Sequence, residues 1–342
     1  MKTFLISRPD AIGDVVLTLP MCGWLKNQFE GCRVVFLGTT YTEPVVACSE
    51  HVDLFINADK LLVLPWEEQV NFLKELQPDV FLHVLPNKHL ARLAKAAEVP
   101  VRVGTRSRWY HWLTCNKLVS LSRKNSDLHE SQLNMLLLTG AGVKVFPALQ
   151  DMHLFYGFTK IDPLPEWLQQ LLVRDNPEQL NIILHPKSRG SGREWSLVHY
   201  SKLAKKLHKL GHQVFITGTA KEGEFLREWL QEHSEFVTDM TGRLTLPEFI
   251  SFARAVDGLV ACSTGTLHIA AAVGVHALGI YPPIRPAYPG RWGPVGEKAS
   301  VLLHPIKCNA CSSVPETCIC INYVRPEQVI AQIKLWHASV IN

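Results

Sequence analysis

Four short segments of the chain combine charged or hydroxyl side chains with glycine, a combination that suits binding of phosphates and hydroxyl groups. The first, 7–14, reads SRPDAIGD and contains Gly13 and Asp14. Glycine lets a ligand approach the backbone closely, and a carboxylate can accept a proton from an attacking hydroxyl. Asp14 equally suits the N-cap of a helix, where it would accept hydrogen bonds from amide groups. The residue types alone leave both interpretations open.

The second segment, 185–196, reads HPKSRGSGREWS and is strongly basic. Lys187, Arg189 and Arg193 could neutralise a diphosphate, while Ser188 and the backbone amides near the glycines donate hydrogen bonds. The spacing is not that of a Walker A loop, G-x-x-x-x-G-K-[ST]. A solvated basic loop is the alternative interpretation.

The third segment, 262–268, reads CSTGTLH and opens a helix of small residues. Ser263, Thr264 and Gly265 at a helix N-terminus suit an anion, because the free amide groups there point at the ligand. His268 could donate to a phosphate or a sugar oxygen. The alternative is an ordinary capped helix with a core histidine.

The fourth segment, 218–222, reads GTAKE and ends in Glu222. A carboxylate after a strand can bind ribose hydroxyls, as acidic residues do in dinucleotide sites. Glu222 suits a position in the first turn of a helix just as well.

Each of these segments follows a short apolar run, and such runs alternate with helical patterns along the chain. This alternation predicts βαβ units with parallel sheets, whose ligands bind beyond the carboxyl ends of the strands. The predicted strands are 3–6, 33–38, 80–85, 101–103, 181–185, 213–217, 258–261 and 277–281. The predicted helices are 15–29, with a bend at Pro20, 66–76, 90–97, 166–173, 197–210, 222–232, 246–255, 267–273 and 326–338.

The rhythm breaks over 151–179, which contains three prolines and forms the expected linker. The sequence therefore predicts an α/β protein with two Rossmann-like domains facing across a cleft, residues 1–160 and 161–325. Residues 326–342 form a C-terminal helix that we expect to pack back on the N-terminal domain.

The length of 342 residues suits two domains, and 47% hydrophobic with 19% charged residues is typical of a globular protein. A formal charge of +4 is too small to indicate nucleic acid by itself. The first apolar stretch, 4–6, is too short for a signal peptide or a membrane span. Five of the nine cysteines are scattered singly, as in reduced cytosolic proteins. We therefore expect a cytoplasmic protein.

The other four cysteines lie within 13 residues near the C-terminus. Their spacing, C-x2-C-x6-C-x-C, could close a tetrahedral structural zinc site, although C-x-C is less usual than C-x2-C in zinc ribbons. Disulfides and reduced thiols are the alternatives, and none of the three makes the cluster catalytic. The candidate ligands are Cys308, Cys311, Cys318 and Cys320.

Taken together, the segments resemble glycosyltransferase family 9, the ADP-heptose:lipopolysaccharide heptosyltransferases. RPDAIGDVVLTLP (8–20) is similar to the opening motif of that family, and STGTLHIAAA (263–272) is similar to its donor-site motif. The loop that ends at Trp195 lies where the family has a basic residue just before a tryptophan. The resemblance covers nearly the whole chain.

The resemblance implies a GT-B fold, with an N-terminal acceptor domain and a C-terminal donor domain. It implies an inverting mechanism in which no cofactor is required for catalysis and Asp14 is the general base. Arg8 and Gly13 belong to the same opening motif, on the acceptor side. ADP-heptose is the favoured nucleotide-sugar donor. The residues that match donor-binding positions are Lys187, Ser188, Arg193, Glu222, Leu244, Ser263, Thr264, Gly265 and His268.

Two positions depart from the family pattern. The family commonly has Asp where this chain has Ser263, and Lys where it has Arg193. Arginine keeps the charge and can bind phosphate through two hydrogen bonds. The loss of the carboxylate leaves the donor sugar open. The same fold with another nucleotide sugar, or a non-catalytic binding module, are therefore the alternatives.

A basic and aromatic stretch, 99–126, lies in the expected acceptor domain and contains no Asp or Glu. It suits an anionic glycolipid acceptor, and its aromatic side chains could stack on sugars or rest at the inner membrane as a peripheral contact. Nucleic acid would also suit such a strip, as would a solvated loop, but we expect no nucleic-acid partner. Arg106 and Arg108 are the candidate acceptor-binding residues, and His129 and Glu130 follow at a helix start.

Overall fold

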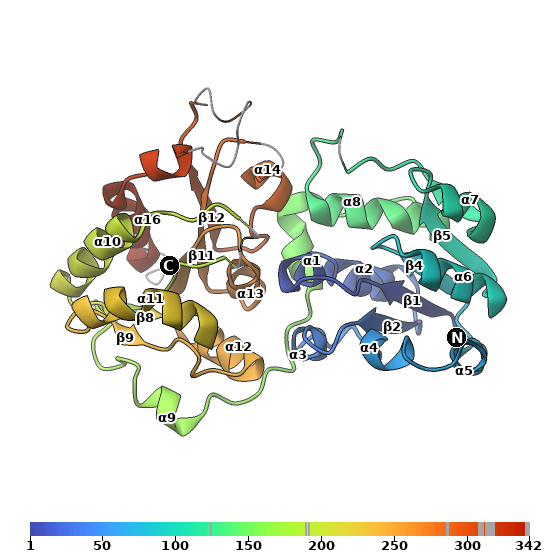
Figure 1. The fold of residues 1–342 in the computed structure, drawn as a ribbon, viewed down its shortest axis with the longest axis horizontal. Helices are drawn as coiled ribbons and strands as arrows, with labels where there is room; N and C mark the ends of the chain where they lie inside the picture. The colour runs from blue at the N-terminus through green and yellow to red at the C-terminus, as the bar shows by residue number, and fades with distance from the viewer. Residues whose placement is uncertain are drawn as a thin grey trace. The chain divides into compact units, whose positions relative to one another are not determined.

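The computed structural model describes residues 1–123, 125–188, 190, 192–284, 287–306, 311 and 319–338. The chain divides into two compact units, Met1–Lys160 and Ile161–Asn342 (Figure 1). Each unit contains one parallel six-stranded sheet covered by helices. The α/β fold class with two Rossmann-like domains, expected from the alternation of short apolar runs and helical patterns, is confirmed.

The sheet of the first unit has the strand order β3-β2-β1-β4-β5-β6. This is the order of a doubly wound fold, which reverses between β1 and β4. At the carboxyl ends of these two strands, Ser7 lies beside His83. The strands are β1 Thr3–Ser7, β2 Arg33–Gly38, β3 Leu54–Asn57, β4 Val80–His83, β5 Val101–Thr105 and β6 Lys117–Val119.

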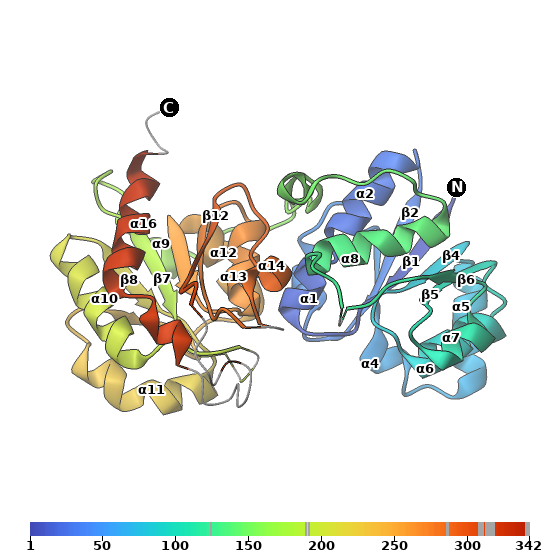
Figure 2. The ribbon, with the colours of Figure 1, turned by 90° about the horizontal axis from the view of Figure 1, so that it is seen from above.

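Helices cover both faces of this sheet, with α2 and α8 on one face and α5 and α6 on the other (Figure 2). Alternate strand residues such as Leu5 and Phe81 form one buried cluster with Leu73 of α5 and Leu90 of α6. The elements are α1 Ile12–Val16, α2 Pro20–Gln28, α3 Glu43–Ala47, α4 Ala58–Leu61, α5 Trp66–Leu76, α6 Lys88–Ala96, α7 Trp109–Thr114, α8 Glu130–Leu136, η1 Leu137–Ala141 and η2 Leu149–Phe155.

The helix predicted over 15–29 is two helices rather than one bent helix. Pro20 begins α2, and α1 ends before it, at Val16. Proline has no amide hydrogen to donate and its ring crowds the preceding turn, so it suits the first helical position and not a helix interior. The break leaves α1 as a short helix directly after β1.

The second unit repeats this topology, with the order β12-β11-β10-β7-β8-β9 and a reversal between β7 and β10. The strands are β7 Asn181–His185, β8 Gln213–Ile216, β9 Thr238–Asp239, β10 Gly258–Ala261, β11 His276–Tyr281 and β12 Ala299–Leu303. The other elements are α9 Glu166–Gln169, α10 Leu197–Lys209, α11 Ala220–Glu232, α12 Leu246–Ala255, α13 Gly265–Ala272, α14 Pro289–Trp292, η4 Cys320–Tyr323 and α16 Pro326–Ala338.

The C-terminal helix α16 belongs to the second unit, where it lies beside α10. We expected it to pack on the N-terminal domain. Instead Ile333 and Trp336 are part of the buried cluster of the second sheet, and the Trp336 ring stacks on His276 at 4.9 Å. Gly258 of β10 makes room, because a Cβ there would lie 2.4 Å from the Trp336 ring.

Candidate functional site

Three of the four segments that the sequence singles out lie where a sheet reverses its strand order. In open parallel sheets, ligands bind beyond the carboxyl ends of the strands at such a reversal. In the first unit β1 leads into 8–14. In the second unit β7 leads into 186–196 and its neighbour β10 leads into 262–264.

Asp14 lies in the first turn of helix α1, which follows the loop after β1. It is not the N-cap of that helix. The N-cap is Ala11, which provides no side-chain hydrogen bond. The capping interpretation of Asp14 is therefore wrong. The Asp14 side chain keeps 21% of its surface exposed, so its carboxylate is within reach of a ligand.

Arg8 connects Asp14 to a buried cluster of charges. Its guanidinium is only 3% exposed and forms an ion pair with Asp14. Arg8 Nε lies 3.2 Å from Asp10 Oδ2, and Nη1 lies 3.3 Å from Glu130 Oε1. Glu130 is fully buried at the start of α8, and Arg123 Nε donates to its Oε1 at 2.8 Å. The cluster ties the β1–α1 turn to residues more than a hundred positions away along the chain.

This cluster determines the electrostatics of Asp14. Burial raises the pKa of the Asp14 carboxyl above its usual value, and the Arg8 cation opposes that effect. The negative charges of Asp10 and Glu130 raise the pKa further. A carboxylate with a raised pKa binds a proton more tightly, which improves it as a general base.

His83, at the end of β4, is the alternative base at this reversal. Burial, with the nearby His111 and Arg102, lowers its pKa to about 3. The imidazole is therefore neutral at physiological pH and has no exposed surface. Because a general base must come within hydrogen-bond distance of the proton that it accepts, Asp14 suits that role and His83 does not.

In the second unit, the basic loop after β7 is organised by an acid that the sequence analysis did not single out. Glu194 Oε1 accepts from the Ser188 amide at 3.0 Å, and its other oxygen forms an ion pair with Lys187. Ser188 Oγ lies 2.9 Å from the Gly192 carbonyl. Arg193 is partly buried in the same turn, whereas Arg189 and Ser191 lie outside the described residues.

The loop after β10 touches the loop after β7. A Cβ on Gly192 would lie 2.9 Å from the Ser263 carbonyl oxygen, and the Trp195 amide donates to Cys262 Sγ at 3.3 Å. Thr264 is the N-cap residue of α13 and makes no side-chain capping bond, which leaves the amides of that end to a ligand.

Two more predicted donor residues follow in this helix. Gly265 is the first residue of α13, and His268, the fourth residue of the same helix, is buried. The structure thus brings together two basic residues, two hydroxyls and a helix N-terminus, a suitable cradle for a diphosphate.

Glu222 and Leu244 do not follow the strands β7 and β10 at the reversal point of the second sheet. Glu222 completes a capping box at the start of α11, where its Oε2 accepts from the Thr219 amide at 2.7 Å and the Thr219 hydroxyl at 2.9 Å. Leu244 is half-buried in the turn before α12. They follow β8 and β9, the strands beyond β7. Glu222 therefore has a structural role whether or not it binds ribose.

The candidate acceptor residues divide into two groups. Arg8 and Gly13 belong to the β1–α1 turn, and the Arg8 guanidinium is committed to three carboxylates. Arg106 and Arg108 are exposed after β5, which β4 separates from β1. The structure therefore does not gather the four residues at one point.

The cysteine cluster is described only in part, since Cys308 and Cys318 lie outside the described residues. Cys311 and Cys320 are buried, and their sulfurs are 3.5 Å apart. That separation exceeds the roughly 2.05 Å of a disulfide, so these two are not bonded to each other. Within the described ranges, no group of three or more His, Cys, Asp and Glu side chains is placed to hold a metal ion.

Two Rossmann-like units in series, each with polar or charged loops at its reversal point, have the architecture of the GT-B fold. Residues 166–321 match the glycosyltransferase family 9 (heptosyltransferase) family. The chain is 24% identical over 319 residues to lipooligosaccharide heptosyltransferase 2 of Haemophilus influenzae, covering 87% of each chain.

Solved structures share this fold. ADP-heptose lps heptosyltransferase II of E. coli superposes over 100% of both chains with a TM-score of 0.75 at 18% identity. A family 9 glycosyl transferase from Veillonella parvula covers 99% of this chain and 97% of its own, with a TM-score of 0.77 at 17% identity. The protein is a glycosyltransferase that resembles the heptosyltransferases of family 9. In the described part of the chain, no helix has the length and apolar character that a membrane span needs.

Proposed function

We propose that the chain transfers a heptose from ADP-heptose to a lipopolysaccharide core acceptor, with inversion at the anomeric carbon and without a required metal. The observation that carries this proposal is the placement of Asp14, partly exposed and with a raised pKa, at the reversal point of the first sheet. The names of the relatives support both substrates, since they are heptosyltransferases of lipooligosaccharide or lps.

In the proposed reaction, an acceptor hydroxyl oxygen attacks the anomeric carbon while its proton passes to the Asp14 carboxylate. The bond between that carbon and the diphosphate oxygen breaks, and ADP leaves. Lys187, Arg193 and the amide groups at the start of α13 would stabilise the negative charge on the leaving group. This arrangement of cations is our reason for proposing that no metal is required. Because Arg8 is buried against three carboxylates, we assign it the positioning of Asp14 rather than acceptor contact.

The substitution Asp14→Asn tests the base. Loss of the carboxylate should lower kcat by roughly 10²–10⁴ while the Kd for ADP stays unchanged. Asp10→Asn is the matched control, because Asp10 pairs with the same arginine but lies outside α1. We expect this control to keep turnover within a few-fold of the wild type. Unchanged turnover in Asp14→Asn would remove Asp14 from the role of base.

Ser263 favours one alternative, the same reaction with another nucleotide sugar, because it replaces the Asp that is common in the family. A thermal-shift series with ADP, UDP, GDP and dTDP distinguishes these donors. A ligand at 100 times its Kd adds about 2.7 kcal/mol to the free energy of unfolding. A response to ADP alone supports the heptose donor. Release of nucleoside diphosphate only in the presence of acceptor would exclude a non-catalytic binding module.

A further inference from the structure

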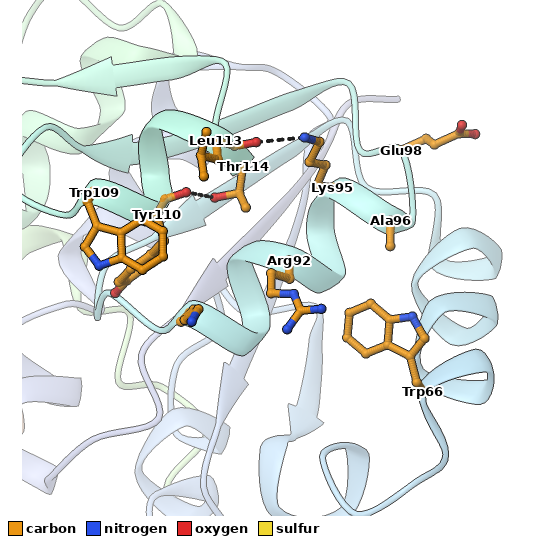
Figure 3. A pocket seen from close by; sticks show the side chains of 10 residues that line it. Trp66, Arg92, Lys95, Ala96, Glu98, Trp109, Tyr110, Leu113 and Thr114 are labelled. Atoms are coloured by element: carbon orange, nitrogen blue, oxygen red, sulfur yellow. Dashed lines mark hydrogen bonds between the residues drawn. The ribbon is translucent and has the colours of Figure 1, made fainter.

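A groove on the first unit lies between α6 and α7, apart from the cluster around Asp14. Its volume is about 710 Å³, and Trp66 of α5 closes one end (Figure 3). The two helices pack side by side, and Lys95 Nζ donates to the Leu113 carbonyl at 2.8 Å. The function proposed above does not use this surface.

One wall of the groove is basic. Lys88, Arg92 and Lys95 are exposed and recur at a spacing of four and then three residues along α6. That spacing places them on one face of the helix. Glu98 is the one acid among the described residues that line the groove, so the wall carries a net positive charge.

The adjoining face of α7 is apolar and exposed. Trp109 is 65% exposed, Trp112 58% and Leu113 64%, whereas His111 and Thr114 of the same helix are buried. Their spacing places the three exposed side chains on the outer face of α7. Large apolar side chains gathered on one exposed face indicate an interaction surface.

Cations and rings alternate on this surface. Lys88 Nζ lies 5.1 Å from the Trp109 ring centre, and Arg106 Cζ lies 6.0 Å from that of Trp112. Arg92 Cζ lies 5.8 Å from the ring centre of Trp66. Each indole therefore has a cation beside it, the pairing that suits a phosphate headgroup above an acyl boundary.

We propose that this α6–α7 surface (Lys88, Arg92, Lys95, Trp109, Trp112 and Leu113) docks the protein on a bilayer that contains anionic phospholipids. Tryptophan rings are stable at the level of the headgroups, and lysine and arginine attract anionic lipids. A nucleic acid would also bind the cations, but it provides no apolar phase for Leu113.

Docking through the α6–α7 surface would bring the site around Asp14 close to a glycolipid acceptor in the bilayer. Both α6 and α7 begin beyond the carboxyl ends of their strands, β4 and β5, and β4 is the neighbour of β1. The end of the surface formed by Lys88 and Trp109 therefore lies toward the edge of the sheet that carries Asp14. This consequence rests on the proposed function, in which the acceptor is a glycolipid, whereas the docking itself does not.

Flotation of the full chain with vesicles tests the proposal without donor or acceptor present. We expect binding to phosphatidylcholine vesicles that contain about one-third phosphatidylglycerol, weak binding to phosphatidylcholine alone, and release at high salt. Lys88→Glu with Arg92→Glu should weaken the binding at least about tenfold. Lys202→Glu with Lys206→Glu is the matched control, because these exposed lysines of α10 have the same spacing.

Trp109→Ser with Leu113→Ser tests the apolar part, with Phe225→Ser, 69% exposed on α11, as its control. The surface variants should lose vesicle binding, keep the wild-type unfolding transition and turn over a delipidated acceptor normally. Equal vesicle binding by the variants and the wild type would overturn the proposal. So would equal binding to neutral vesicles, or binding of a single-stranded oligonucleotide in place of vesicles. If one double variant fails to unfold cooperatively, the other decides.

Discussion

Glu130 is fully buried between two guanidinium groups, and its charge acts on Asp14. As a base, Asp14 is active when ionised, so turnover falls as the pH falls through its pKa. The Glu130 charge raises that pKa. In Glu130→Gln the pKa should be lower, and the acid limb of the kcat/KM profile should move to lower pH. Turnover on the plateau should fall modestly, because a weaker base remains.

The pH profile of kcat/KM for the wild type and Glu130→Gln measures this effect. Glu68→Gln is the control, because Glu68 is an exposed carboxylate of α5. Its acid limb should coincide with that of the wild type. An acid limb of Glu130→Gln that stays in place, or that moves to higher pH, would show that the charge of Glu130 does not act on the base.

The sequence locates the reactive residues of the site better than it locates the residues that orient them. Asp14 could be singled out because a glycine and a carboxylate follow the first predicted strand within a few residues, and its role as the base is implied only by the resemblance to family 9. Glu130, whose charge acts on Asp14, pairs with Arg8 although the two lie 122 positions apart along the chain. Only the fold brings Glu130 and Arg8 together. Glu194 is local, but a single acid in a basic loop gives no signal that it holds Lys187 and the Ser188 amide in place.

At the scale of the elements, the strands that the sequence pattern predicts are the four inner strands of each sheet. All four strands that the sequence pattern missed are sheet edges: β3, β6, β9 and β12. Inner strands are buried on both faces and read as continuous apolar runs, whereas an edge strand is short and half-exposed. β6 has three residues and β9 has two, and both include charged residues. Their formation depends on the strand beside them.

The position of α16 leads to a prediction about Gly258. A Cβ at Gly258 would lie 2.4 and 2.7 Å from ring atoms of Trp336 and 2.9 Å from His276 Cβ. Gly258→Ala should therefore lower the free energy of unfolding by about 1–3 kcal/mol, because the ring must move within a packed core. Urea unfolding measures the change. Lys334→Ala, at an exposed position of α16, should change stability by less than about 0.5 kcal/mol. A neutral Gly258→Ala would contradict this packing of α16.

At the scale of the whole molecule, one topology occurs twice although no sequence repeat is visible. Both sheets have the same strand order when counted along their own segments of chain. The two units are alike in the alternation of strands and helices, which many different sequences can form. They are not alike in particular residues. The chemistry differs because each unit has its own side chains at the reversal: a carboxylate cluster in the first, and cations with hydroxyls in the second.

Each unit also has a buried core of its own, so the second unit should fold and bind nucleotide alone. The cluster that includes Leu184, Val260 and Trp336 lies entirely within 161–342. The residues proposed to bind the diphosphate lie in the same unit. A fragment of residues 161–342 should therefore unfold cooperatively and bind ADP with a Kd within about tenfold of the full chain, although without Asp14 it should not transfer sugar.

Calorimetric titration of the fragment with ADP, beside the full chain, measures this. Arg193→Ala in the fragment is the control and should weaken ADP binding by about 1.5–3 kcal/mol, the range for a hydrogen bond to a charged group. A fragment that folds but does not bind ADP would place essential nucleotide contacts in the first unit. The donor site would then depend on both sheets and not on the reversal between β7 and β10 alone.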